Sequence, residues 1–145
     1  MKKSRPLIGI IAAEAEYVFF SNALNTIQKE LFAANMDAAV FSSLMMSGNA
    51  EFDAAENSVY DLVDFDLLDG IIIFSSSIND VTSRERLIAR IKSDFKGPVV
   101  SFDSQVDGFA NCLYNYEPVA DMMVSHIMDH HGCKVIDFVG GPKDE

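Results

Sequence analysis

Short apolar runs alternate with helical stretches along this chain, and this alternation restricts its fold more than any other feature. Continuous apolar runs bounded by turn residues are typical of strands that are covered on both faces. Such runs predict strands at residues 7–12, 38–41, 71–74, 99–103 and 135–139. Strands that alternate with helices form βαβ units with right-handed crossovers. The sequence therefore predicts an α/β fold with three layers, in which helices flank an open parallel sheet.

The stretches between these runs carry apolar residues at helical spacing. They are residues 20–31, 52–63, 87–95 and 119–130. Asn35 is placed to stop the first helix, and Asn49 to cap the second. Residues 82–85 (TSRE) have the spacing of a capping box, which predicts the start of the third helix. Pro118 suits the first turn of the fourth helix, and Gly132 suits the position after its end.

The composition excludes several classes of protein. Hydrophobic residues make up 49% of the 145 residues and 11 of them are phenylalanine, which excludes an intrinsically disordered chain. The formal net charge of −11 argues against a nucleic-acid-binding face and against docking on anionic lipid. No apolar run approaches the roughly 20 residues that a membrane helix needs. We therefore expect no direct nucleic acid contact from this segment and no membrane association.

The first residues indicate a mature cytoplasmic protein. A basic start precedes an apolar run, as in a signal peptide, but Glu14 and Glu16 interrupt the run and no clean cleavage site follows. The two cysteines, Cys112 and Cys133, make no disulfide framework. We expect them to be reduced and partly buried.

Polar and aromatic side chains follow the predicted strands, at the edge where an open parallel sheet binds its ligands. Hydroxyls and carboxylates hydrogen-bond polyols and amides, and aromatic rings pack on sugar faces. For any single serine, ordinary turn chemistry is the simpler explanation. Three serine-rich strand ends at one edge weaken that explanation. The candidates at this edge are Glu14, Glu16, Tyr17, Phe19, Phe20, Ser42, Ser43, Ser75, Ser76, Ser77, Asp103 and Ser104.

The motifs of several enzyme classes are missing from the sequence. Gly9 stands alone after the first strand, so the dinucleotide-binding fingerprint is missing, and no P-loop or nucleophile elbow occurs. A phosphoacceptor domain would need adjacent acids after the first strand, whereas Glu14 and Glu16 are separated. We therefore expect no enzymatic activity and no cofactor.

Histidines near the end of the fourth predicted helix raise the question of a metal site. His126 and His130 are four residues apart and could share a helix face, with His131 and Cys133 nearby. Two such histidines can bind a metal ion, but no third ligand stands at a strong spacing. Histidines in a last helical turn also interact favourably with the helix dipole. That second interpretation is preferred, and we expect no metal site.

Six segments, in order and at matching spacing, resemble the ligand-binding core of the lac repressor family, a branch of the type I periplasmic-binding-protein fold. They are residues 6–11 (PLIGII), 19–20 (FF), 68–73 (LDGIII), 97–103 (GPVVSFD), 115–132 and 134–142 (KVIDFVGGP). The family's third strand reads VDGIIL, its fourth IPVVxID and the later one RRIAFIxGP. This chain departs from the family at Tyr17-Val18, where Asn-Pro is usual, and at Ser104, where sugar-binding members often have arginine.

The resemblance implies a two-lobed sensor that closes on a small-molecule effector, often a sugar or a nucleobase-like compound. Residues 1–115 would be the N-terminal lobe, and residues 116–145 the crossover, helix and first strand of a truncated second lobe. The family's DNA-binding head would precede Arg5. The resemblance also implies a homodimer formed through helices of the first lobe. The ligand contacts that it implies are Tyr17, Phe19, Phe20, Ser75, Ser76 and Asp103.

Two kinds of parent protein fit this resemblance. In the first, the segment is the cytoplasmic effector-sensing domain of a transcriptional regulator of the lac repressor family. In the second, it is the N-terminal ligand sensor of a signalling enzyme, such as a diguanylate cyclase or a histidine kinase. The abundance of regulators favours the first, and a start without a DNA-binding head favours the second. A scaffold that dimerises and binds no ligand is a third possibility.

Overall fold

The computed structural model describes residues 5–44 and 49–140 of the chain. These residues belong to two compact units, Met1–Leu113 and Tyr114–Glu145. The division lies close to the boundary expected after residue 115. The interpretation of the two units as parts of two lobes stays a prediction.

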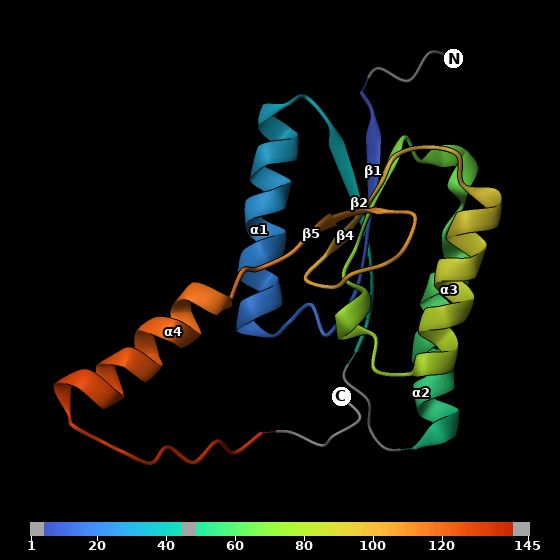
Figure 1. The fold of residues 1–145 in the computed structure, drawn as a ribbon. Coiled ribbons are helices and arrows are strands. Elements are labelled where there is room, and N and C mark those ends of the chain that lie inside the picture. The colour runs from blue at the N-terminus through green and yellow to red at the C-terminus, as the bar shows by residue number, and fades with distance from the viewer. Residues whose placement is uncertain (1–4, 45–48, 141–145) are drawn as a thin grey trace. The chain divides into compact units, whose positions relative to one another are not determined.

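The first unit is built on a five-stranded sheet whose strands are all parallel. The strands are β1 (Leu7–Ala13), β2 (Asp37–Ser43), β3 (Gly70–Ile73), β4 (Val99–Phe102) and β5 (Ala110–Cys112). Their order across the sheet is β2-β1-β3-β4-β5 (Figure 1). The predicted parallel α/β sheet is therefore confirmed.

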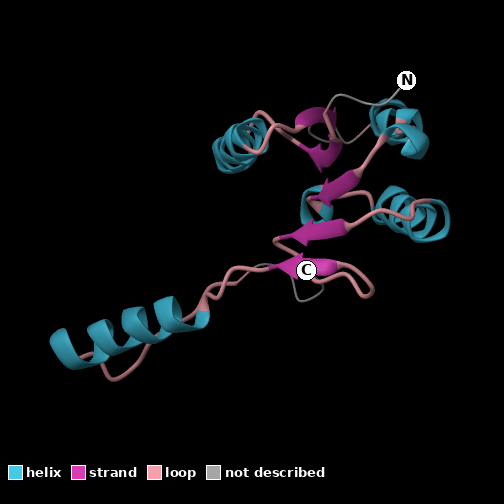
Figure 2. Ribbon diagram, turned by 90° about the horizontal axis from the view of Figure 1, so that it is seen from above, coloured by secondary structure: helices cyan, strands magenta, loops and turns pink. Residues whose placement is uncertain are grey.

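Helices cover both faces of this sheet, which gives the expected three layers (Figure 2). α1 (Val18–Ala33) lies on one face, and α2 (Ala50–Asn57) and α3 (Val81–Asp94) lie on the other. Successive residues of a strand point to opposite faces, so Ile10 packs with the apolar residues of α1 and Ile11 with those of α3. Both isoleucines are fully buried. This double burial is why β1 is apolar without alternation.

The end of α1 and the start of α2 lie where the sequence predicts them. Asn35 has a φ of +60°, a conformation that asparagine tolerates better than most residues. The N–H of Asn35 donates to the carbonyl of Phe32, and the N–H of Met36 donates to that of Leu31, so the helix ends in a Schellman motif. The side chain of Asn49 accepts two backbone N–H groups from the first turn of α2. The free N–H groups at that helix start are thereby satisfied.

α3 begins earlier than the predicted capping box. Asp80 is its N-cap, and Asp80 Oδ2 accepts the N–H of Ser83 at 2.7 Å. The hydrogen bonds from Ser83 hold the pKa of Asp80 below its ordinary value, and the charges of Arg86 and Arg84 add to this effect. The prediction that Thr82 caps the helix is wrong, because the carboxylate two residues earlier already satisfies the free N–H group.

The second predicted helix is shorter than its apolar pattern suggests. α2 ends at Asn57, and a 3₁₀ helix spans Ser58–Leu62. Residues three apart are aligned in a 3₁₀ helix, so Tyr60 and Val63 both face the core. Leu62, expected on the buried stripe, is 73% exposed. The α-helix that the periodicity predicts for residues 58–62 is therefore wrong, because this segment is a 3₁₀ helix.

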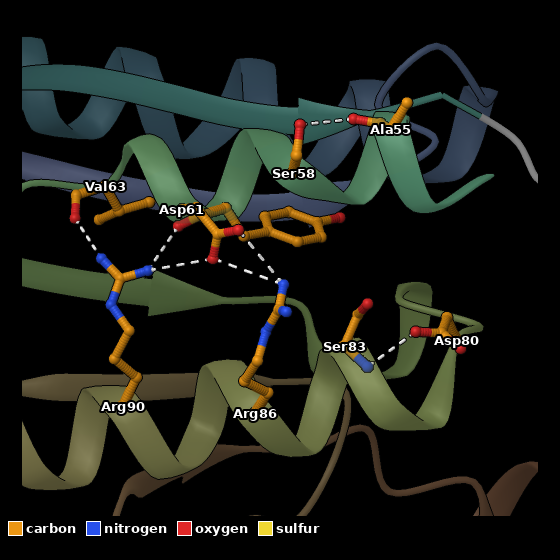
Figure 3. A network of polar contacts seen from close by, with 9 residues as sticks. Ala55, Ser58, Asp61, Val63, Asp80, Ser83, Arg86 and Arg90 are labelled. Atoms are coloured by element: carbon orange, nitrogen blue, oxygen red, sulfur yellow. Dashed lines mark hydrogen bonds and ion pairs between the residues drawn. The ribbon is translucent and has the colours of Figure 1, made fainter. Parts of the chain in front are cut away.

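Arg90 of α3 holds the end of this 3₁₀ helix (Figure 3). Its Nη1 donates to the carbonyl of Tyr60 at 3.0 Å, and its Nη2 donates to the carbonyl of Val63 at 2.6 Å. Asp61 lies between Arg86 and Arg90 and pairs with them at 3.4 and 3.7 Å. The backbone carbonyls at the end of this segment thus find a partner in the neighbouring helix.

The second unit contains α4 (Glu117–Ser125), which continues as a π-helical turn over His126–His130. Pro118 stands in the first turn, as expected, and Gly132 follows the helix with a φ of +66°. The strand expected at residues 135–139 is not formed among the described residues of this unit. A strand needs a neighbour to pair its N–H and C=O groups, and this segment pairs with none there.

Two other expectations concern the surface. Cys112 and Cys133 are free, but both are exposed, so the expected partial burial is wrong. Cys112 is exposed because it belongs to β5, the last strand of the sheet, whose residues are all exposed. None of the described helices has the length and apolar character needed to cross a membrane.

Candidate functional site

The carboxyl ends of β1 and β3 meet where the strand order reverses. β2 lies on one side of β1 and β3 on the other, and open α/β sheets bind ligands at such a switch point. Glu14 follows β1 directly, in a left-handed conformation with a φ of +55°. Glu14 Oε1 accepts a hydrogen bond from Asn79 Nδ2 at 3.2 Å, and the N–H of Ala13 donates to Ser77 Oγ at 2.8 Å. These bonds tie the end of β1 to the segment after β3.

Three serine hydroxyls connect the ends of β3 and β4. Ser75 Oγ and Ser101 Oγ both bond to Ser104 Oγ, the second at 3.1 Å. Ser101 Oγ also donates to the carbonyl of Ser104 at 2.7 Å. Ser75 and Ser101 are buried, whereas Ser104 is half-buried. The three serines therefore fix the shape of this edge, and Ser76 is the exposed hydroxyl beside them.

Asp103 directly follows β4, between Ser101 and Ser104 of this serine network. Its φ is +59°, a left-handed conformation that aspartate adopts more readily than most residues. Its N–H donates to the carbonyl of Cys112 at 2.9 Å, which anchors the turn to β5. The residue is half-buried. The turn thus holds Asp103 at the same edge as Ser75, as the sequence predicts.

A line of aromatic rings runs along the same edge from α1 to β4. The ring centroids of Phe19 and Phe20 are 5.3 Å apart, and those of Phe20 and Phe74 are 5.9 Å apart, both in edge-to-face geometry. Phe102 follows at 4.7 Å from Phe74. Phe74 is fully buried and Phe20 is half-buried, while Phe19 and Tyr17 are 46% and 44% exposed. Phe20 is thus part of the packing, and the accessible rings are Phe19 and Tyr17.

A buried tyrosine supports the end of β1 from the opposite face. Tyr60 Oη donates to the carbonyl of Ala12 at 3.0 Å and accepts from Ser43 Oγ at 2.8 Å. Burial raises the pKa of Tyr60 above its ordinary value, and the bond from Ser43 partly offsets this. The neutral hydroxyl therefore joins β1, β2 and the 3₁₀ segment.

Sequence reasoning missed three of these residues. Ser101 lies inside an apolar strand, and a lone serine there is a signal that could have identified it. Tyr60 was missed because the sequence predicts a regular α-helix for its segment, and nothing in the sequence distinguishes Asn79. Glu14, by contrast, was among the edge candidates. The six implied ligand contacts lie on the segments that meet at this edge, but Ser75 and Phe20 are partly committed to internal contacts.

A recess with a volume of about 410 Å³ lies at the amino ends of β4 and β5, against α3. Its lining includes Phe95, Pro98, Gly108 and Phe109. Within the described part of the chain, no group of three or more His, Cys, Asp or Glu side chains is arranged to hold a metal ion.

Comparison with known proteins supports the fold. The crystal structure of the lac repressor dimer bound to operator and the anti-inducer ONPF superimposes with a TM-score of 0.65, at 15% sequence identity. The match covers 88% of this chain and 42% of the lac repressor chain, so this chain spans less than half of that protein. No protein-family profile matches the sequence. No curated protein matches it either.

Proposed function

We propose that the first unit is an effector-binding lobe of a small-molecule sensor similar to the lac repressor. The observation that carries this proposal is the carboxyl edge of the sheet, where Glu14, Asp103 and the exposed residues Tyr17, Phe19 and Ser76 follow the ends of β1, β3 and β4. These groups stand on the fold that the lac repressor also has. An open α/β sheet binds its ligand at this edge.

The chemistry of the edge favours a neutral polyhydroxylated ligand, such as a sugar or a nucleoside. Carboxylates accept hydrogen bonds from ligand hydroxyls, and aromatic rings pack against sugar or base faces. An anionic ligand is disfavoured by the two carboxylates and by the net charge of −11. Ser104 provides no positive charge to offset them, and its hydroxyl is already bonded to Ser75 and Ser101.

The sensing itself would be a closure of two lobes around the ligand. We propose that the parent protein is a cytoplasmic transcriptional regulator that works as a homodimer, and that this segment has no enzymatic activity. The solved lac repressor is a dimer bound to operator and to an anti-inducer, which supports this assignment by fold similarity. A monomer in sedimentation of the full-length protein at tens of micromolar would contradict the dimer.

Thermal-shift screening of the full-length protein against neutral sugars and nucleosides tests the proposal. A true ligand raises the melting temperature in a dose-dependent way, because it binds only the folded state; at 100 times Kd the gain is about 2.7 kcal/mol. Such a hit would exclude a scaffold that binds nothing. A complete panel without a hit would refute the proposed ligand class.

Once the screen has identified a ligand, the variant Asp103→Asn tests whether that ligand binds at the carboxyl edge. Asparagine tolerates the left-handed backbone at this position, so the fold is kept while the carboxylate is lost. We expect the affinity to fall by about tenfold or more, as for the loss of a charged hydrogen-bond acceptor. Asp107→Asn is the matched control, because Asp107 is exposed and follows in the same loop. Equal affinities for the two variants would place the ligand elsewhere.

A further inference from the structure

All three histidines of the chain lie together at the end of α4, in the second unit and outside the carboxyl edge. They are His126, His130 and His131. Their ring centroids are 4.8 to 5.1 Å apart in all three pairs. The cluster is exposed, so a solute can reach the rings.

The local helix geometry decides which two histidines meet through their nitrogens. Residues 126–130 form a π-helical turn, in which residues five apart are brought into register. Accordingly, His126 Nε2 and His131 Nε2 are 3.1 Å apart. The rings of His126 and His130, four residues apart, stack with an angle of 22° between their planes. The pair that the sequence spacing suggests is therefore not the pair that converges.

Two Nε2 atoms at this distance can be satisfied in two ways. One ring can donate its proton to the other, or both rings can be neutral with the proton on Nδ1 and point their lone pairs at one cation. A metal ion about 2.0–2.1 Å from each nitrogen, at an angle between 90° and 110°, requires a nitrogen separation of about 2.8–3.4 Å. The observed 3.1 Å lies within this range.

We propose that His126 and His131 bind one divalent transition-metal ion of the zinc, nickel or copper class, with water at the remaining positions. Imidazole nitrogen is a preferred ligand for these ions. The site stands at the C-terminal end of α4, where the partial negative charge of the helix dipole favours a cation. It has two protein ligands, in agreement with the lack of any three-residue metal-binding group among the described residues. The site is therefore open, with exchangeable water.

Zinc titration of the whole chain by calorimetry tests this site. The measurement uses a variant in which Cys112 and Cys133 are serine, so that thiolates cannot bind the ion. We expect one zinc ion per chain, and His131→Ala should weaken binding by about tenfold or more, because one of two protein ligands is lost. His130→Ala is the matched control and should bind as tightly as the parent.

Nitrogen NMR of the unsubstituted histidines provides a readout that does not depend on folding of the variants. On zinc addition, the Nε2 resonances of His126 and His131 should shift together, while those of His130 change little. Either of two results overturns the proposal. One is no saturable binding up to millimolar zinc; the other is equal loss of affinity in His130→Ala and His131→Ala.

Discussion

Replacing Arg90 with methionine should destabilise the first unit by about 2–3 kcal/mol. The guanidinium donates to the carbonyls of Tyr60 and Val63, and hydrogen bonds from charged groups contribute about 1.5–3 kcal/mol each. The Arg90 side chain is 29% exposed, so water can replace much of the two bonds, and the net loss is taken as that of one bond in the lower half of this range, about 1.5–2 kcal/mol. The guanidinium also lies 4.8 Å from the ring centroid of Phe65, a contact worth about 0.5–1 kcal/mol. Methionine keeps the apolar part of the arginine side chain, so the decrease in the free energy of unfolding reports on the guanidinium group.

Arg86→Met is the matched control for this prediction. Arg86 lies one turn earlier on α3, is 60% exposed, and pairs with the exposed carboxylate of Asp61 at 3.4 Å. Exposed ion pairs contribute about 0–1 kcal/mol. We therefore expect Arg86→Met to cost less than about 1 kcal/mol, although it removes the same charge from the same face of the helix.

Urea denaturation followed by far-UV circular dichroism gives both free energies of unfolding. The reasoning predicts a clearly larger loss for Arg90→Met than for Arg86→Met. Equal losses would refute it. A loss for Asp61→Asn as large as that for Arg90→Met would show that the ion pair, and not the bonds to the carbonyls, fixes the 3₁₀ segment.

Two further substitutions test buried and capping hydrogen bonds by urea denaturation. Tyr60→Phe should cost about 1–3 kcal/mol at pH 7, because Ser43 and the Ala12 carbonyl lose their buried partner. The pKa of Tyr60 is raised in the fold, so above about pH 10 the tyrosine of the unfolded chain ionises first. The free energy of unfolding of the wild type should then fall toward that of Tyr60→Phe. A difference between the two proteins that stays constant with pH would contradict this. Asp80→Ala should cost about 1 kcal/mol at pH 7. The pKa of Asp80 is lowered by the hydrogen bonds from Ser83, so its carboxylate stabilises the fold above about pH 4, and this stabilisation should be lost as the pH falls further. A difference in free energy of unfolding between the wild type and Asp80→Ala that persists at about pH 2 would contradict this.

The sheet could be predicted from the sequence because its strands are buried on both faces. Ile71 and Ile73 are nearly fully buried, and such positions leave a continuous apolar run that no other element of this length matches. The predicted strand at residues 135–139 (VIDFV) is also mostly apolar, but it lacks a neighbour among the described residues. An apolar run therefore predicts a strand only where a partner strand is present.

Helix boundaries were harder to predict, because several residues compete for one role. Asp80 and Thr82 are both good N-caps, and local spacing alone favoured the wrong one. Tyr60 and Val63 fit a helical period as well as a 3₁₀ period over so short a segment. The bonds from Arg90, which lies on another helix, stabilise the observed geometry and cannot be read from local sequence.

The candidate site was located by topology and only partly by residue type. The rule that ligands bind at the carboxyl ends of parallel strands points to Ser75, Ser76 and Asp103 from the predicted strands alone. It could not distinguish a buried hydroxyl such as Ser75 from an exposed one such as Ser76. The buried hydroxyl of Ser75 bonds to that of Ser104, which follows the next strand of the sheet, and such a contact cannot be read from the local sequence.

Backbone NMR of the full-length protein, recorded during titration with a ligand from the thermal-shift screen, tests the central proposal most directly. We predict that the largest amide shifts occur at residues 14–20, 75–79 and 103–104, where the ends of β1, β3 and β4 meet. Shifts concentrated around Phe95 and Phe109, in the recess at the other end of the sheet, with the carboxyl edge unchanged, would contradict it.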